Sequence, residues 1–124
     1  SGIPDNAQQF VNQIKEVDGI VLSLAEYNGS FAAAFKNLWD WCSRIDQKIW
    51  ADKPMFLAAT SPGGRGGKGV LSHVMSLISH FGGNVIVDFS LPSFYDNFKE
   101  GVIIDSGMNL ELNTKINQFQ KSIS

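Results

Sequence analysis

Residues 54–69 read PMFLAATSPGGRGGKG, an apolar run that leads directly into a stretch containing five glycines. A short apolar run bounded by turn residues is typical of a buried strand. Apolar residues at helical spacing then follow over residues 70–81, and Gly82 and Gly83 provide the stop signal for that helix. This stretch therefore predicts a strand, a glycine-rich loop and a helix in succession.

The same alternation extends to both sides of this unit. Apolar runs at 20–24 and 84–89 predict two further buried strands. Residues 92–107 are irregular, with a short extended piece expected at 101–104. Helical periodicity occupies the remaining segments, 5–17, 31–42 and a last segment whose inner face is Leu112, Ile116 and Phe119. Strands that alternate with helices predict a parallel sheet covered on both faces, a three-layer αβα arrangement.

Two loops after predicted strands carry unusual residues. Residues 25–30 contain Glu-Tyr-Asn-Gly-Ser, and residues 61–69 contain the glycines. Ligands of open parallel sheets bind beyond the carboxyl ends of the strands, so these loops are the candidate binding site. Ser30 is also placed to cap the helix that follows it.

The two loops resemble motifs of the NAD(P)H-dependent FMN reductase family. The segment AEYNGSFAAAFKNLWDW is similar to that family's Pro-Glu-Tyr-Asn-x-Ser, followed by Leu-Lys-Asn and Asp-Trp, and TSPGGRGG resembles its Ser-Pro-Gly-Gly turn. The residues that match the first motif are Glu26, Tyr27, Asn28, Ser30, Lys36, Asn37, Asp40 and Trp41. The resemblance implies a flavodoxin-like fold, of which this chain supplies the C-terminal part.

The resemblance also implies a function and a set of site residues. FMN would bind noncovalently, NADPH or NADH would donate hydride, and the acceptor would be a quinone, azo compound, flavin or metal oxyanion. Arg65 and Lys68 suit the phosphate of NAD(P)H. No catalytic acid or base and no metal is expected. The isoalloxazine would lie between two groups of residues: Glu26, Tyr27, Asn28 and Ser30 on one side, and Ser61, Pro62, Gly63 and Gly64 on the other.

Two departures from the family pattern affect these expectations. Ala25 stands where the family usually has proline, which loosens the turn. The family also begins with a strand and a Ser- and Arg-bearing loop that holds the FMN phosphate, and no such strand precedes residue 18. We therefore expect residues 1–124 to form a single flavodoxin-like domain that is N-terminally truncated and binds flavin poorly by itself.

Two other functions fit parts of the sequence. Residues 64–69 satisfy the dinucleotide fingerprint G-x-G-x-x-G, with Asp88 about 20 residues further on, although Ser61, Pro62 and Gly63 separate it from the strand. The chain could alternatively be a flavodoxin-like assembly module without a cofactor. In that case residues 26–28 form only a solvated turn.

Composition limits the partners. The net charge is −2 and the 10 Lys and Arg are scattered, which argues against nucleic-acid binding. No apolar stretch approaches the roughly 18 residues that a membrane span needs. The single cysteine, Cys42, favours a reducing compartment, so we expect a cytoplasmic protein in which this thiol is buried.

The helix expected from Phe31 to Cys42 suggests association between copies. Trp39 and Trp41 lie on opposite flanks of its apolar arc, where they could either seal the helix against the sheet or contact a partner helix. Members of the resembled family pair through this helix, so a homodimer or homotetramer is expected. His73 and His80 share the edge of one helix face. With no acidic or cysteine ligand on that face, we interpret them as boundary histidines and not as a metal pair.

Overall fold

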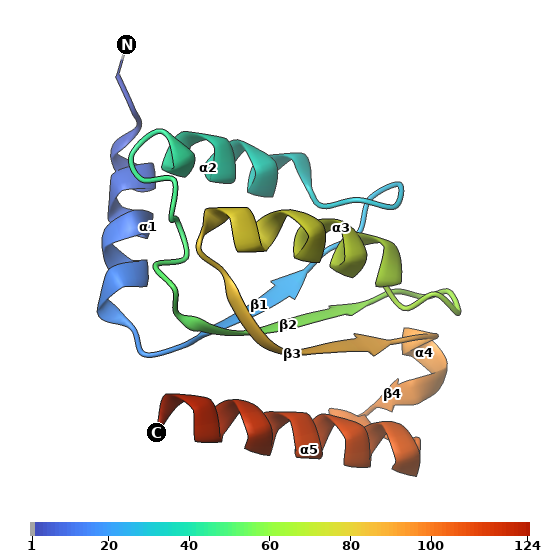
Figure 1. Ribbon diagram of the computed structural model, residues 1–124. Coiled ribbons are helices and arrows are strands. Elements are labelled where there is room, and N and C mark those ends of the chain that lie inside the picture. The colour runs from blue at the N-terminus through green and yellow to red at the C-terminus, as the bar shows by residue number, and fades with distance from the viewer. Residues whose placement is uncertain (1) are drawn as a thin grey trace.

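The computed structural model describes residues 2–124. Three helices cover one face of a central sheet and the C-terminal helix covers the other (Figure 1). The helices are α1 (Asp5–Glu16), α2 (Ala33–Ser43), α3 (Lys68–Ile78), α4 (Phe94–Asn97) and α5 (Ser106–Ile123), with a 3₁₀ turn η1 (Ser79–Phe81) after α3. The strands are β1 (Ile20–Leu24), β2 (Pro54–Thr60), β3 (Asn84–Leu91), β4 (Phe98–Lys99) and β5 (Val102–Ile103).

The central sheet is parallel, with the order β1-β2-β3. The register pairs Leu24 with Ala59 and Thr60 with Leu91, so the carboxyl ends of the three strands are aligned. The predicted αβα architecture and the positions of the three strands are confirmed. None of the helices within residues 2–124 has the length and apolar character needed to cross a bilayer.

Strand β2 lies in the middle of the sheet, and this position explains why its sequence is apolar throughout. Met55 and Leu57 are fully buried against the cluster that includes side chains of α1, α2 and α3. Phe56, which points to the opposite face, packs with Phe119 of α5 at a ring distance of 5.9 Å. Both faces of β2 are therefore covered, as the continuous apolar run of a buried parallel strand requires.

Strand β1 differs from the expectation that it is buried on both faces. Its side chains alternate between exposed and more buried positions, and Val21 is 67% exposed. The reason is that α5 packs against β2 and β3, which leaves the adjoining face of β1 uncovered. Val21 instead lines an apolar groove of about 540 Å³, together with Phe56, Phe119 and Ile123.

Trp39 is buried inside the chain, which agrees with the interpretation that it seals its helix against the rest of the fold. Trp39 is 4% exposed and makes edge-to-face contacts with Trp50 at 5.6 Å and Phe81 at 5.3 Å. The irregular segment after α2 folds back and inserts Trp50, itself 1% exposed, into the same core. Trp39 therefore seals the chain's own interior, and of the two flanking tryptophans only Trp41 remains partly accessible.

The boundaries of several elements differ from the predicted ones. Strand β3 continues to Leu91, and the irregular segment contains α4 and a short antiparallel pair of β4 with β5. Helix α2 begins at Ala33 with Ala32 as its N-cap, so Ser30 does not cap it. The Ser30 hydroxyl is used elsewhere, as described below.

Burial controls the chemistry of the single cysteine. Cys42 is 0% exposed, its Sγ lies 3.7 Å from the Ala7 carbonyl oxygen, and burial raises the pKa of its thiol. A raised pKa lowers the fraction of reactive thiolate at any given pH. We predict that a thiol reagent at pH 8 labels the native protein at least about a hundredfold more slowly than the urea-unfolded protein, a ratio that corresponds to an opening free energy of ~2.7 kcal/mol.

The rate is measured by absorbance, with Cys42→Ser as the control that gives no signal. Labelling of the native protein at the rate of the unfolded chain would contradict the burial of this thiol.

Candidate functional site

The two candidate loops lie at the same end of the sheet. Residues 25–30 follow β1 and residues 61–67 follow β2, and the pairing of Leu24 with Ala59 places both loops beyond neighbouring strand ends (Figure 1). The structure therefore brings together the two segments that the sequence indicated as a site. What each loop contributes depends on how it is held.

The first loop is a two-residue hairpin turn. The Tyr27 amide donates to the Ser30 carbonyl oxygen at 2.7 Å, and the Ser30 amide donates to the Tyr27 carbonyl oxygen at 3.0 Å. Asn28 and Gly29 both have positive φ angles, 52° and 80°. The dipeptide Asn-Gly favours such turns because these two residues adopt the left-handed region most readily. The turn projects outward, and the Tyr27 side chain is 63% exposed.

The carboxylate of Glu26 acts as a cap on α3. Its Oε2 accepts a hydrogen bond of 2.9 Å from the amide of Val70, the third residue of that helix. The N-cap position itself is Gly67, which has no side chain to offer. An acidic group at a helix N-terminus satisfies an unpaired N–H and interacts favourably with the helix dipole. The Glu26 side chain is thus engaged within the protein, which leaves Tyr27 and Asn28 as the outward-facing part of the loop.

Ser30 and Phe31 make a second connection between this loop and α3. The Ser30 Oγ lies 2.9 Å from Nδ1 of His73, and the ring of Phe31 stacks on the His73 ring at 4.8 Å with an interplanar angle of 23°. The sequence offered no signal for this contact, because Ser30 and His73 are 43 positions apart. His73 was expected to be only a boundary residue.

The second loop uses its glycines in two different ways. A Cβ at Gly66 would lie 2.5 Å from the Ser90 Oγ, and a Cβ at Gly67 would lie 2.7 Å from the Ala59 Cβ, so these positions allow close packing against the sheet. A Cβ at Gly63 or Gly64 would meet nothing within 4 Å. The first two residues of this glycine-rich stretch therefore border open space, as the approach of a flat ligand requires.

Hydrogen bonds fix the second loop to the segment that follows β3. The Ser93 amide donates to the Gly63 carbonyl oxygen at 2.8 Å, and the Phe94 amide donates to the Ser61 carbonyl oxygen at 2.9 Å. The Ser90 hydroxyl donates to the Gly66 carbonyl oxygen at 2.7 Å. The loop that carries Pro62 and the two open glycines is thus held by the neighbouring strand end.

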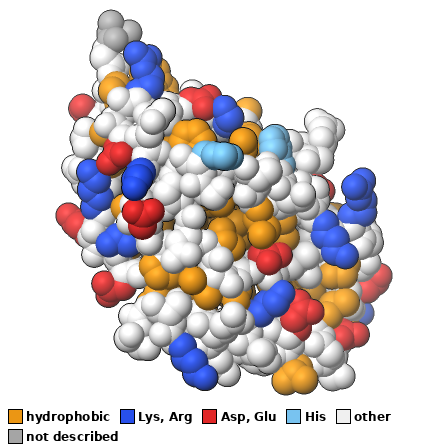
Figure 2. All heavy atoms as spheres, viewed as in Figure 1, with side chains coloured by type: hydrophobic (Ala, Val, Ile, Leu, Met, Phe, Trp, Pro, Cys, Tyr) orange, Lys and Arg blue, Asp and Glu red, His pale blue; other side chains and the backbone are white. Residues whose placement is uncertain are grey.

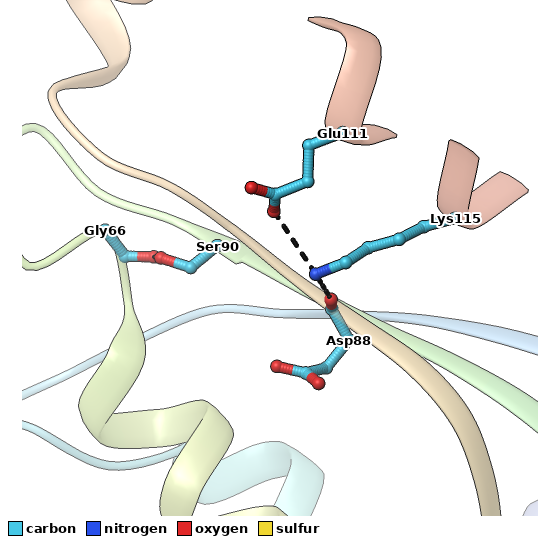
Figure 3. Close-up of polar contacts among 5 residues, drawn as sticks. All are labelled: Gly66, Asp88, Ser90, Glu111 and Lys115. Atoms are coloured by element: carbon cyan, nitrogen blue, oxygen red, sulfur yellow. Dashed lines mark hydrogen bonds and ion pairs between the residues drawn. The ribbon is translucent and has the colours of Figure 1, made fainter. Parts of the chain in front are cut away.

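Lys68 lies in different surroundings from the other predicted site residues. It lines a cavity of about 590 Å³ along the edge of β3, whose lining includes no residue of 25–30 or 61–64. In that cavity Lys115 donates to the Asp88 carbonyl oxygen at 2.5 Å and to Glu111 Oε2 at 3.2 Å. Figure 3 shows the Asp88 carboxylate directed away from Lys115. Arg65 is exposed on the loop itself.

The dinucleotide fingerprint finds little structural support. The fingerprint requires its first glycine in the turn directly after the strand, whereas Gly64 follows the end of β2 at Thr60 only after Ser61–Gly63. Asp88 lies within β3 and not at its end. A Cβ at Gly69 would lie 2.8 Å from Glu26 Oε2 and 3.2 Å from the Gly29 carbonyl oxygen, so this glycine accommodates the first loop.

Charge does not single out this region. Figure 2 shows acidic and basic side chains interspersed over the visible face, with no large patch of one sign there. A mixed surface of this kind does not attract a polyanion as a whole.

Comparison with known proteins identifies relatives of this arrangement. Residues 1–96 match the profile of the family described as NADPH-dependent FMN reductase. The chain is 32% identical over 108 residues to the 2-hydroxy-1,4-benzoquinone reductase of Burkholderia sp., covering 86% of this chain and 57% of that protein. It is 32% identical over 77 residues to the quinone reductase of Escherichia coli strain K12, covering 62% of this chain and 41% of that protein. The chain thus spans about half the length of these curated relatives.

Solved structures support the fold. The flavoenzyme NAD(P)H:(acceptor) oxidoreductase FerB of Paracoccus denitrificans superposes with a TM-score of 0.71 and 22% identity, over 96% of this chain and 70% of that chain. An oxidoreductase of Corynebacterium diphtheriae gives a TM-score of 0.72 and 17% identity, over 97% of this chain and 63% of that chain. At these identities the likeness shows that the fold is shared.

The cap that Glu26 provides generates a stability prediction. Glu26→Ala leaves the Val70 amide without its partner and should lower the free energy of unfolding by about 1–2 kcal/mol. Glu26→Gln keeps an accepting oxygen and loses only the charge–dipole attraction, about 0.3–1 kcal/mol. Urea denaturation measures both variants.

Asp40→Ala is the matched control, because Asp40 is a 60% exposed carboxylate whose partner within residues 2–124 is Lys36, one turn away. Its removal should cost less than about 0.5 kcal/mol. If Glu26→Ala lowers the free energy of unfolding by no more than Asp40→Ala does, Glu26 is not a structural cap.

Gly67 and Gly29 provide a second matched pair. Both have positive φ, 78° and 80°, so alanine meets a similar backbone penalty of about 1–2 kcal/mol at each. Only at Gly67 does the added Cβ also collide with the sheet. Gly67→Ala should therefore lower the free energy of unfolding by about 1–3 kcal/mol more than Gly29→Ala, as measured by urea denaturation. Equal losses would show that close packing at Gly67 is unimportant.

Proposed function

This chain belongs to the NADPH-dependent FMN reductase family, and from that premise we propose that it carries the ring-binding loops of an NAD(P)H-dependent FMN reductase. The chemistry that FMN supplies when bound is hydride transfer from a nicotinamide to an acceptor. Quinones are the proposed acceptor class, because relatives include proteins described as quinone reductases. Azo compounds, free flavins and metal oxyanions are alternative small acceptors.

One observation carries the proposal. The turn of Tyr27–Ser30 and the open glycines Gly63 and Gly64 follow aligned, neighbouring strand ends, and a Cβ added at either glycine would meet nothing within 4 Å. A planar ring system needs close contact with backbone, and a glycine surface permits it. The residues present therefore fit the ring of FMN. A cofactor phosphate would need further donors, since α3 already has the Glu26 carboxylate at its N-terminus.

The proposed roles of the residues follow from their exposure. Exposed Tyr27 and Asn28, with the backbone of the turn, would contact one side of the ring, and Pro62, Gly63 and Gly64 would contact the other. Glu26, Ser30 and Ser61 would hold the loops, because their side chains bond to Val70, His73 and the Gly63 carbonyl oxygen. No side chain is needed as an acid or base.

Two further elements belong to the proposal. Arg65, exposed on the glycine loop, and Lys68, at the start of α3, are the proposed contacts for the phosphate of NADPH or NADH. Association of copies through α2 would use Trp41, which lies beneath Arg44 at 5.6 Å, because Trp39 is buried.

A titration of FMN with the protein tests the proposal. The fluorescence of the flavin should fall as protein is added, and Gly64→Val should raise the dissociation constant at least about tenfold by filling the open space, a loss of ~1.4 kcal/mol. Gly2→Val is the control, because Gly2 also borders open space but precedes α1 and belongs to neither loop. An absence of quenching by the wild-type protein, or equal affinity of both variants, would overturn the proposed site.

A further inference from the structure

We propose that His73 is a positioning residue for the flavin-binding turn, holding the segment Tyr27–Phe31 in place from α3. This inference rests on the proposed function above, and it concerns a residue outside both loops. His73 contacts the loop at two places, through Nδ1 to the Ser30 hydroxyl at 2.9 Å and through its ring face to Phe31 at 4.8 Å.

The contact acts at the closing residue of the turn. Ser30 exchanges both backbone hydrogen bonds with Tyr27, so movement of Ser30 opens the turn. Loops at a protein surface are usually more mobile than the elements that they connect. His73 adds a side-chain bond to the same residue that closes the backbone ring.

The helix gives His73 a rigid base. Val70 and Val74, which precede and follow it on α3, are both fully buried. The Glu26 carboxylate holds the amide of Val70, one turn before His73. The loop is thus attached to one segment of α3 at both ends, by Glu26 before the turn and by Ser30 and Phe31 after it.

The hydrogen bond between His73 and Ser30 can form with either tautomer of the imidazole ring. With the proton on Nε2, the Ser30 hydroxyl donates to Nδ1; with a proton on Nδ1, the ring donates to the Ser30 oxygen. The role of His73 is therefore to hold the turn. A turn that is already held loses less conformational entropy when a ligand binds, which strengthens binding without a new contact to the ligand.

Substitutions at His73 separate the hydrogen bond from the ring contact. His73→Phe keeps a ring that stacks on Phe31 and removes Nδ1, whereas His73→Asn places an amide near the position of Nδ1 and removes the ring. The loss of one hydrogen bond corresponds to a factor of about two to ten. We expect His73→Phe to weaken FMN binding by this factor, and His73→Asn to recover most of the loss.

Amide hydrogen exchange in the FMN-free protein supplies a second readout. The Tyr27 and Ser30 amides should exchange about two- to tenfold faster in His73→Phe than in the wild type. His80→Phe, at the other exposed histidine of the same helical segment, should leave both the exchange rates and the FMN affinity unchanged.

A double-mutant cycle with Ser30→Ala decides whether the two residues act together. If they do, adding Ser30→Ala to His73→Phe changes FMN affinity little further. Additive effects, a His73→Asn variant as weak as His73→Phe, or wild-type affinity in His73→Phe would overturn the role of His73 while leaving the flavin site intact. No quenching by the wild-type protein would overturn the flavin site and this role with it.

Discussion

The parallel pairing of β1 with β2 is the constraint on which the site depends. Because Leu24 lies opposite Ala59, the chain leaves both strands at the same level, and both loops start from one edge of the sheet. The pairing is held in turn by the burial of β2 on both faces, with Met55 and Leu57 on one side and Phe56 on the other. The geometry of the loops is thus a consequence of core packing.

Helix α3 holds the first loop in position above the sheet edge. Its buried face packs on the sheet through Val70, Val74 and Ile78, and its first two turns meet Glu26 and Ser30 through Val70 and His73. The polar side chains of the loop are therefore engaged in holding it. The outward-facing groups that remain are the Tyr27–Asn28 portion of the turn, which suits recognition of a flat ring by backbone and aromatic surface more than recognition by charge.

The architecture could be predicted from the sequence because its signals are local. The apolar run PMFLAAT, the helical spacing after it and the stop at Gly82 depend on neighbouring residues alone, and all three correspond to observed elements. The position of the loops at one sheet edge follows from parallel topology. The partners of Ser30 and Glu26 could not be predicted, because they lie 43 and 44 positions away, and capping statistics assigned Ser30 to the nearest helix instead.

The surroundings of Trp39 and Val21 could not be read from the sequence for a similar reason. Periodicity describes one face of an element but not which other segment covers it. Trp39 is covered by Trp50 from a segment without periodicity, and Val21 is uncovered because α5 lies over the neighbouring strands. Each side chain was assigned from its own helix or strand, and each outcome depends on the path of a distant part of the chain.

Backbone strain at the site has the same dependence on packing. Ser93 has a positive φ of 47°, which is unfavourable for most residues other than glycine, and Asn28 has a φ of 52°, which asparagine tolerates better. Ser93 is held by the hydrogen bond that its amide donates to the Gly63 carbonyl oxygen. Asn28 is held by the two backbone hydrogen bonds between Tyr27 and Ser30, which flank the turn. These bonds begin and end on residues fixed by strand ends or by α3, so the packing of the chain supports both conformations. Contacts such as those of His73 with Ser30 and Phe31 add to this support from outside the loops.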